Sequence, residues 1–151
     1  MADAREIAAV IVREARPGDA PALAALAGVM GYDVTAGEAA ERLARQLSEA
    51  SGAVFVAEID GRVAGYVQAV ERRILVVEPF VELGGLAVLP GARRRGLARL
   101  LLAAVDAWAA SRGFDLVRVR SRRERDDAHA TYLACGFALD KEQLVFSKPV
   151  G

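Results

Sequence analysis

The chain has 151 residues, 54% of them hydrophobic and 26% charged, a balance typical of one globular domain and not of a disordered segment. Lys plus Arg number 20 and Asp plus Glu number 20, so the zero net charge argues against a protein held to nucleic acid by a general positive field. The single histidine, His129, and the single cysteine, Cys135, exclude a disulfide framework and a His-rich metal site. Without a long apolar run or a signal-peptide pattern, we expect a cytoplasmic protein with one domain over residues 1–151.

The first half of the chain reads as strand, two helices and a hairpin. A strand is predicted over residues 7–13 and ends at Pro17-Gly18-Asp19, where Asp19 is placed to cap a helix over residues 21–30. A second helix is predicted over residues 36–50, because Ala39, Leu43 and Leu47 fall on one face. Residues 54–59 then lead through Asp60-Gly61, a strong hairpin signal, into a return strand from residue 63 towards residue 77.

The second half predicts a strand–helix–strand unit. A strand over residues 80–89 ends at Pro90-Gly91, and the longest helix follows from Leu97 to a stop at Gly113. Because a strand over residues 116–120 comes next, the two strands are expected to be parallel neighbours. A short helix over residues 126–134 and a strand over residues 144–148 close the chain. The fold class is therefore α/β, with a mostly antiparallel sheet around one parallel pair.

One segment, from Leu86 to Ala98, joins a strand to the start of the longest helix through a short loop. The first turn of a helix has unpaired N–H groups and the positive end of the dipole, a combination that holds phosphate groups. Gly96 and Ala98 are small enough for a ligand to approach the backbone closely. The three arginines at residues 93–95 supply positive charge for a polyanion. The glycine spacing fits neither the Walker loop nor the dinucleotide fingerprint. A phosphate cradle of another kind and a solvated loop are the two interpretations.

The pattern Arg93-x-x-Gly96-x-Ala98 after this strand resembles the acyl-CoA motif of the GCN5-related N-acetyltransferases, the GNAT family. Residues 125–137 resemble the second family signature, in which Ala128 stands four residues before Tyr132 and Gly136-Phe137 follows. Residues 11–19 and the hairpin at residues 54–67 are similar to the family as well. The resemblance implies a GNAT-like sheet with a splayed parallel strand pair and about four flanking helices.

The resemblance also implies a cofactor site for acetyl-CoA, as co-substrate and without a metal. In that site the helix start holds the CoA pyrophosphate, and the preceding strand pairs with the pantetheine arm and offers an N–H to the thioester carbonyl. The cofactor-binding residues so implied are Leu86, Ala87, Val88, Arg93, Arg94, Arg95, Gly96, Leu97, Ala98 and Ala128.

Two catalytic candidates follow from the resemblance. Tyr132 matches the family tyrosine near the thioester sulfur, where it would protonate the leaving thiolate. A phenol suits this role because its reference pKa of about 10 lies above the value of about 8.5 for a thiol. The alternative for Tyr132 is a core aromatic beside Phe137. Glu82 is the one carboxylate between Pro79 and Asp106, so it is the candidate base for the amine, although relatives carry acids closer to Leu86. An exposed strand residue is an equal interpretation of Glu82, and a water chain or no dedicated base also fits the family mechanism.

Three further alternatives stay open. The basic run from Arg118 to Arg125 is either a solvated face or a contact with the CoA 3′-phosphate or with an acidic substrate. The chain is either an N-acetyltransferase, in which a primary amine of a small molecule or peptide attacks acetyl-CoA directly in a ternary complex, or a non-catalytic acyl-CoA sensor. The apolar residues 74–77 and 144–146 supply either a homodimer interface or core. We expect neither a nucleic-acid nor a membrane partner.

Overall fold

The computed structural model describes residues 9–151, and it divides the chain into two compact units, one up to Arg120 and one from Ser121 onward. The sheet of the first unit contains β1 (Val10–Glu14), β2 (Gly52–Ile59), β3 (Arg62–Arg72), β4 (Phe80–Val88) and β5 (Val117–Val119). Its helices are α1 (Ala20–Val29), α2 (Ala36–Leu47) and α3 (Leu97–Ser111), whereas α4 (Asp126–Ala134) belongs to the second unit. The single domain over residues 1–151 stays a prediction.

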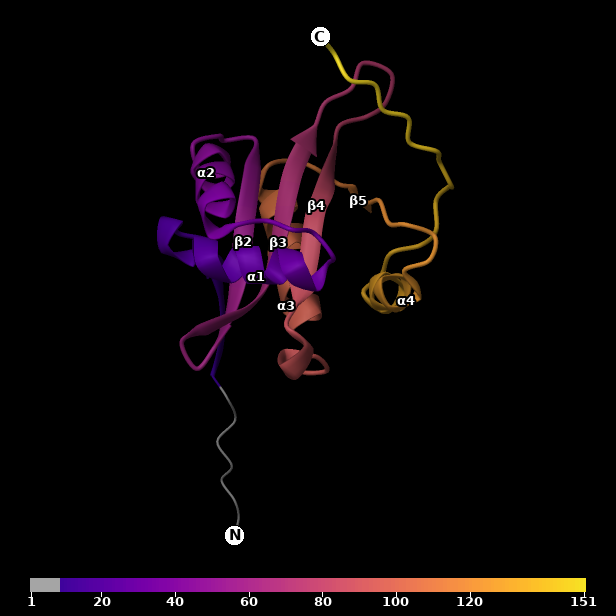
Figure 1. Cartoon of the computed structure of the whole chain (residues 1–151). Helices are drawn as coiled ribbons and strands as arrows, with labels where there is room; N and C mark the ends of the chain where they lie inside the picture. Colours follow the sequence, from indigo (N-terminus) through magenta and orange to yellow (C-terminus); the bar gives the residue numbers. More distant parts are fainter. Residues whose placement is uncertain (1–8) are drawn as a thin grey trace. The chain divides into compact units, whose positions relative to one another are not determined.

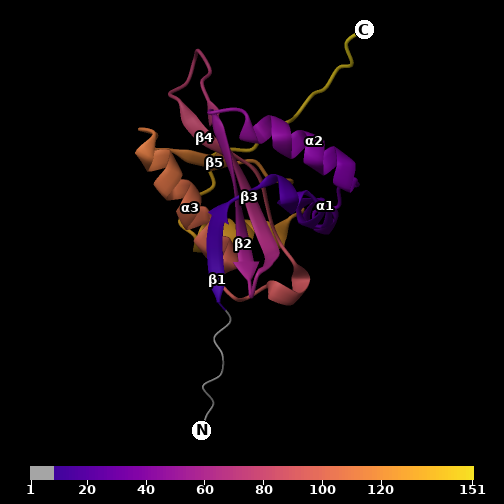
Figure 2. The same cartoon turned by 90° about the vertical axis from the view of Figure 1, so that its left-hand side faces the viewer.

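The five strands lie side by side in chain order, antiparallel from β1 to β4 and parallel between β4 and β5 (Figure 1). The α1 and α2 helices cover one face of this sheet and α3 covers the other (Figure 2). A Cβ at Gly65 would lie 3.2 Å from Leu101 of α3, so Gly65 and Val67, two residues on, face α3. Tyr66 faces the other way and packs against the α1 and α2 core. The prediction of an α/β fold with one parallel strand pair in a mostly antiparallel sheet is confirmed, and the pair lies at one edge of the sheet.

Most predicted elements are confirmed within a few residues of their expected bounds. The hairpin turns at Asp60 (φ 50°) and Gly61 (φ 82°), the left-handed pair that a two-residue turn requires. The return strand ends at Arg72 and does not reach residue 77, and residues 7 and 8 of the first predicted strand lie outside the described residues. None of the described helices has the length and apolar character needed to cross a membrane.

The predicted strand over residues 144–148 is wrong, because the chain has no regular structure from the end of α4 to Gly151. Leu144, Val145 and Phe146 are each more than three-quarters exposed. Consecutive apolar residues fit a strand pattern, but a strand also needs a neighbour whose backbone completes its hydrogen bonds. The described residues provide no such neighbour for this segment.

The longest helix buries a stripe of aliphatic side chains: Leu97, Leu101, Leu102, Val105 and Ala109. Trp108, which the periodicity also places in the stripe, is only half-buried and lies under the guanidinium of Arg112, 4.8 Å from the ring centroid. On the other face, Leu43 of α2 is buried as predicted but Leu47 is exposed, which agrees with the end of α2 at Leu47.

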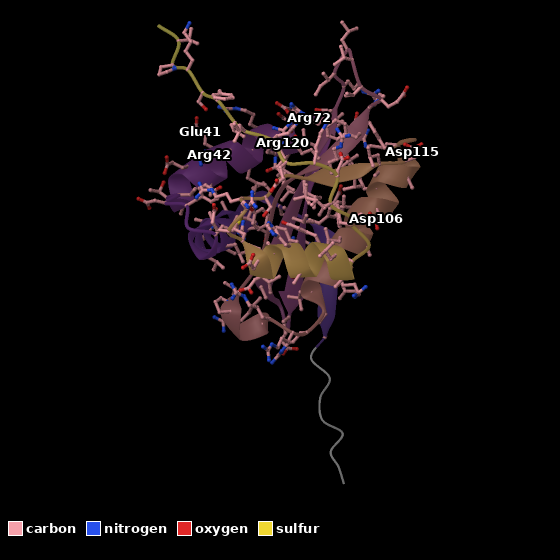
Figure 3. The ribbon with its side chains drawn as sticks, turned by 90° about the vertical axis from the view of Figure 1, so that its right-hand side faces the viewer. Glu41, Arg42, Arg72, Asp106, Asp115 and Arg120 are labelled. Carbon is pink, nitrogen blue, oxygen red and sulfur yellow. The ribbon has the colours of Figure 1, made fainter. Side chains whose placement is uncertain are left out.

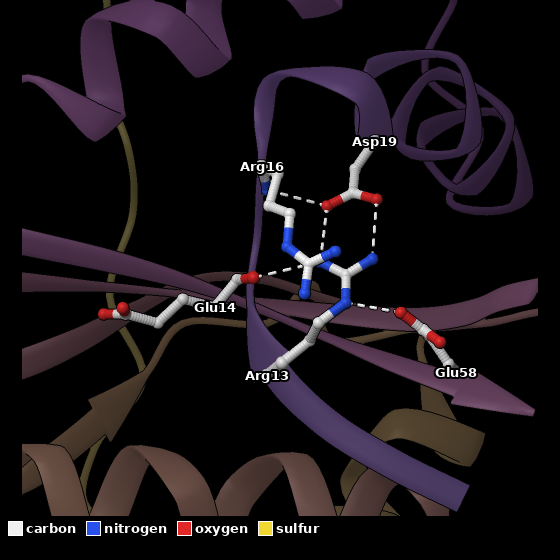
Figure 4. Close-up of polar contacts among 5 residues, drawn as sticks. All are labelled: Arg13, Glu14, Arg16, Asp19 and Glu58. Atoms are coloured by element: carbon white, nitrogen blue, oxygen red, sulfur yellow. Dashed lines mark hydrogen bonds and ion pairs between the residues drawn. The ribbon is translucent and has the colours of Figure 1, made fainter. Parts of the chain in front are cut away.

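A buried ion cluster ties β1 to the turn that follows it (Figure 4). Arg13 binds both oxygens of Asp19, at 2.8 and 2.9 Å, and its Nε pairs with Glu58 of β2. Asp19 also accepts a hydrogen bond of 2.7 Å from the N–H of Arg16. Asp19 stands at the start of α1 as predicted, but its carboxylate turns towards Arg13 and makes no side-chain cap to the helix. The guanidinium competes successfully because a bidentate ion pair is stronger than a neutral N–H contact.

Candidate functional site

The loop between β4 and α3 turns on two residues in the left-handed region, Arg94 (φ 67°) and Gly96 (φ 76°). Gly96 is the N-cap of α3 and has no side chain with which to cap it. The first N–H to bond within the helix is that of Leu100, which donates to the carbonyl of Gly96. The N–H groups of Leu97 and Ala98 therefore have no partner in the preceding turns of the helix. This opening suits an anion such as a phosphate group.

The electrostatics of this loop favour a polyanion. Arg93, Arg94 and Arg95 are all exposed, and no ion pair holds any of them among the residues that the structure describes. The first turn of α3 contains no acidic residue. Since guanidinium charge and the positive end of the helix dipole act together, a pyrophosphate is attracted here and a cation is repelled.

Next to the loop, β4 loses its parallel neighbour. The pairing of β4 with β5 runs from Val81–Val117 to Leu83–Val119 and stops there. From Gly84 to Val88, β4 keeps β3 on one side, and the described residues place no strand on the other. Leu86, Ala87 and Val88 thus lie on a backbone edge that an extended ligand can pair with.

A β-bulge marks the point where this edge begins. Gln68 pairs with Gly85 and Ala69 with Leu83, which leaves Gly84 as an extra residue on β4. A Cβ on Gly85 would come within 2.4 Å of the Tyr66 hydroxyl, and one on Gly84 within 2.9 Å of the Gln68 side chain. The Tyr66 ring therefore requires a glycine at position 85, whereas a side chain at position 84 would displace only the flexible end of Gln68.

Glu82 lies two residues before the bulge with 18% of its side chain exposed. Its two oxygens lie 3.3 Å from Nε of Arg72 and 3.1 Å from Nε of Arg120. Sequence reasoning placed Glu82 near the site but did not find its partners, because they come from β3 and from the end of β5. Glu82 is therefore not the exposed, unpaired strand residue of the alternative interpretation.

Tyr132 and Ala128 lie on α4 in the second unit, and both are half-buried. The rings of Tyr132 and Phe137 meet edge to face with centroids 5.6 Å apart. Burial raises the pKa of Tyr132 above its usual value, although the charge of Arg125 opposes the shift. A phenol with a raised pKa keeps its proton at neutral pH and has one to donate. His129, one turn before, has its Nε2 2.9 Å from the carbonyl of Arg122.

Comparisons with known proteins identify the family of this chain. The sequence model of the acetyltransferase (GNAT) family matches residues 23–137. An aminoglycoside N(6')-acetyltransferase type 1 of Stenotrophomonas maltophilia is 35% identical over 144 residues, which cover 92% of this chain and 93% of that protein.

Two solved structures illustrate the shared fold. The aminoglycoside N-acetyltransferase AAC(6')-Iy in complex with CoA has a TM-score of 0.86 at 24% identity, covering 98% of this chain and 99% of that one. The aminoglycoside antibiotic 6'-N-acetyltransferase AAC(6')-Ih from Acinetobacter baumannii has a TM-score of 0.83 at 20% identity, covering 95% and 100%. Identities this low establish the fold and leave the acceptor open.

Proposed function

Because the chain belongs to the acetyltransferase (GNAT) family, we propose that it transfers the acetyl group of acetyl-CoA to a primary amine of a small molecule or peptide, by direct attack in a ternary complex. The observation that carries this proposal is the uncapped start of α3 beside the unpaired edge of β4. One element suits a pyrophosphate and the other an extended arm, so together they fit the two ends of CoA.

In the proposed site, the N–H groups of Leu97 and Ala98 hold the pyrophosphate, and Arg93, Arg94 and Arg95 neutralise its charge. The backbone of Leu86, Ala87 and Val88 aligns the pantetheine arm, and an N–H of this stretch stabilises negative charge on the thioester oxygen. The thioester supplies an activated acetyl group, and the residues of the chain bind and orient it. Ala128 is proposed as a further cofactor contact because of its place in the family signature.

Tyr132 is proposed as the general acid that gives its proton to the leaving thiolate. Two features support this role: its place in the family signature and the burial that raises its pKa, which keeps the phenol protonated throughout the neutral range.

Glu82 is the proposed base for the amine proton. To accept that proton, its carboxylate would have to release its ion pairs with Arg72 and Arg120. An amine that enters already neutral, or a water that relays the proton, needs no such release. Glu82→Gln separates these routes: loss of turnover supports the base, whereas retained turnover supports a mechanism without one.

A second candidate function, the non-catalytic acyl-CoA sensor, is favoured by one observation. Gly84 and Gly85 occupy the stretch of β4 where several members of the family carry an acid, and the carboxylate of Glu82 is already paired. A sensor binds acetyl-CoA and turns over no amine.

Isothermal titration with acetyl-CoA and CoA tests the cofactor site first. Gly96→Glu adds a negative charge at the helix start, so we expect it to abolish binding that the wild type shows in the micromolar range. Gly91→Glu is the matched control, because Gly91 lies in the same loop, has no positive φ, and would have no atom within 4 Å of a Cβ added to it. Equal loss in both variants, or no binding by the wild type, would refute the site.

A thiol-release assay over a panel of amines then separates enzyme from sensor. Release of free thiol that depends on an added amine identifies the transferase. Tight binding of acetyl-CoA with no release for any amine leaves the sensor as the function.

A further inference from the structure

A cluster of charged side chains lies on the α1 and α2 face of the sheet, beside the bulge in β4. Across β3 and β4, Val70 pairs with Glu82 and Arg72 pairs with Phe80. Val70 and Arg72 lie an even number of residues after Tyr66, so these four side chains lie on the same face of the sheet as Tyr66. Arg118 pairs with Glu82 across the parallel strands and joins the same face. We call Arg72, Glu82, Arg118 and Arg120 the arginine cluster; Figure 3 shows Arg72 and Arg120.

Two guanidinium groups in this cluster share one carboxylate. Glu82 lies 3.3 Å from Nε of Arg72 and 3.1 Å from Nε of Arg120, so its single negative charge meets two positive charges. A third guanidinium, that of Arg118, stacks over Phe80 at 4.7 Å. The Nε of Arg72 is buried and, although it forms an ion pair with Glu82, has no hydrogen-bond partner among the described residues. The hydrogen-bonding capacity of the Arg72 guanidinium is thus not exhausted by Glu82.

The arginine cluster stands where the parallel strands separate. Glu82 precedes the last paired residue of β4, Leu83, and Arg120 follows the last paired residue of β5, Val119. At about 3.3 Å per residue, Glu82 lies roughly 13 Å along the strand from Leu86. The reacting end of a pantetheine arm that starts at Val88 and runs along this edge therefore approaches the cluster.

The two acidic residues of α2, which covers this face of the sheet, are paired within their own helix. Glu38 and Glu41 of α2 each pair with an arginine one turn on, Arg42 and Arg45. Glu71 and its partners Arg73 and Arg112 belong to the α3 side of β3. An acceptor with several ammonium groups would meet net repulsion at the cluster, whereas one with a carboxylate would find guanidinium donors.

We propose that Arg72 and Arg120, with Arg118 beside them, form a subsite for a carboxylate on the acceptor, so that the substrate is an amine that also carries a carboxylate and is not a polycationic aminoglycoside. The inference rests on the proposed function and adds the class of acceptor to it. Free amino acids and peptides both present this chemistry. In both, the guanidinium groups fix the carboxylate while the amine faces the thioester.

The test compares acceptors that differ in one charge. Initial rates of thiol release are measured with the standard amino acids, with glycyl dipeptides, with the amide of each, with 1,5-diaminopentane and with the aminoglycoside sisomicin. For the best acceptor we expect kcat/KM to be at least tenfold higher for the acid than for its amide. The amino-acid and dipeptide arms distinguish the two sources of the carboxylate.

Arg72→Gln and Arg120→Gln are expected to raise KM for the acid at least tenfold, with KM for acetyl-CoA unchanged. Arg73→Gln is the matched control, since Arg73 adjoins Arg72, carries the same charge and stacks on Phe114 on the opposite side of β3. Arg120→Glu is expected to reverse the preference towards the amide and the diamine. Thermal melting of each variant reports any loss of folding separately.

Several results would overturn the inference. If the wild type acetylates the amides, 1,5-diaminopentane or sisomicin as well as it acetylates the acids, the subsite does not exist. If Arg73→Gln raised KM for the acid as much, the effect would come from the loss of one positive charge on the protein and not from a subsite. Weaker binding of CoA by Arg120→Gln, with dephospho-CoA unaffected, would assign the cluster to the 3′-phosphate. Absence of turnover with every amine would instead refute the acetyl transfer on which the inference rests.

Discussion

At the scale of single residues, Asp19 is the one charged residue that is buried among those the structure describes, and its main partner is Arg13. Asp19 is 8% exposed, and its carboxylate accepts two hydrogen bonds from Arg13 and one from the backbone of Arg16. A buried charge left without its partner is costly, because neither water nor a counter-charge solvates it. These contacts lower the pKa of Asp19, with the hydrogen bond from Arg13 as the largest cause.

Asp19→Asn is therefore expected to lower the free energy of unfolding at pH 7 by about 1–3 kcal/mol, because the half-buried Arg13 loses two hydrogen bonds and keeps only its ion pair with Glu58. Since the pKa of Asp19 is lower in the folded state, its contribution is full above the ordinary value of 3.8 and is lost as the pH falls below it. Urea unfolding at pH 7, 4 and 3 measures this. The difference between wild type and variant is expected to shrink as the pH falls, whereas the exposed control Glu41→Gln changes little at any pH.

Tyr132→Phe tests the proposed general acid. Removal of the hydroxyl is expected to lower kcat by about 10²–10⁴-fold, the usual contribution of a positioned acid, without weakening acetyl-CoA binding. Because burial raises the pKa of Tyr132, the wild type is expected to keep its acid to a higher pH than an exposed tyrosine would. A pH profile of kcat and a titration with acetyl-CoA measure both effects. Tyr32→Phe, at an exposed tyrosine of the first unit, is the matched control.

At the scale of elements, the bulge in β4 links backbone geometry to the site. Gly85→Ala places a methyl group 2.4 Å from the Tyr66 hydroxyl, which itself lies 3.5 Å from the sulfur of Met30. Because Tyr66 packs in the α1 and α2 core, it cannot move without disturbing its neighbours. We expect a loss of about 1–3 kcal/mol in unfolding free energy, as for other overpacked sites. Chemical denaturation measures it, and Gly91→Ala, with open space around Gly91, is expected to be neutral.

The strand–loop–helix segment was predictable because its signals are local. Proline, glycine and the helical spacing from Leu97 onward all lie within a short stretch of sequence, and so do Asp60 and Gly61 of the hairpin. The arginine cluster was not predictable as a unit, since Arg72, Glu82 and Arg120 come from three strands and meet only through their register. The strand expected over residues 144–148 failed for the same kind of reason, because an apolar pattern does not specify which neighbour will pair with it.

At the scale of the whole molecule, the zero net charge conceals a strong local one. The loop of Arg93, Arg94 and Arg95 and the arginine cluster stand at opposite ends of the unpaired stretch of β4, and each has an excess of positive charge. The first suits the phosphates of a cofactor and the second the carboxylate of an acceptor. Composition alone excluded a general positive field, but only the register of the strands shows where the positive charge gathers.

Apolar exposure at the same scale supports the prediction of a homodimer. The loop between β3 and β4 contains four consecutive apolar residues, and its Leu75 and Val76 are 100% and 83% exposed. Exposed apolar residues that adjoin one another are common at interfaces between protein chains, and a second copy of the chain is the partner that we expect to cover them. We therefore expect the wild type to sediment as a dimer at micromolar concentration.

Leu75→Asp with Val76→Asp is expected to give a monomer, because it would bury four charges at a two-fold interface. Acetyl-CoA binding should persist, since the loop lies outside the proposed cofactor site. Leu144→Ser with Phe146→Ser tests whether the second exposed apolar segment forms the dimer interface. Leu47→Asp on α2 is the control for a single exposed apolar residue. Sedimentation velocity reads out all four proteins. A wild type that sediments as a monomer contradicts the homodimer. If only the Leu144→Ser with Phe146→Ser variant becomes a monomer, the interface lies at residues 144–146 instead.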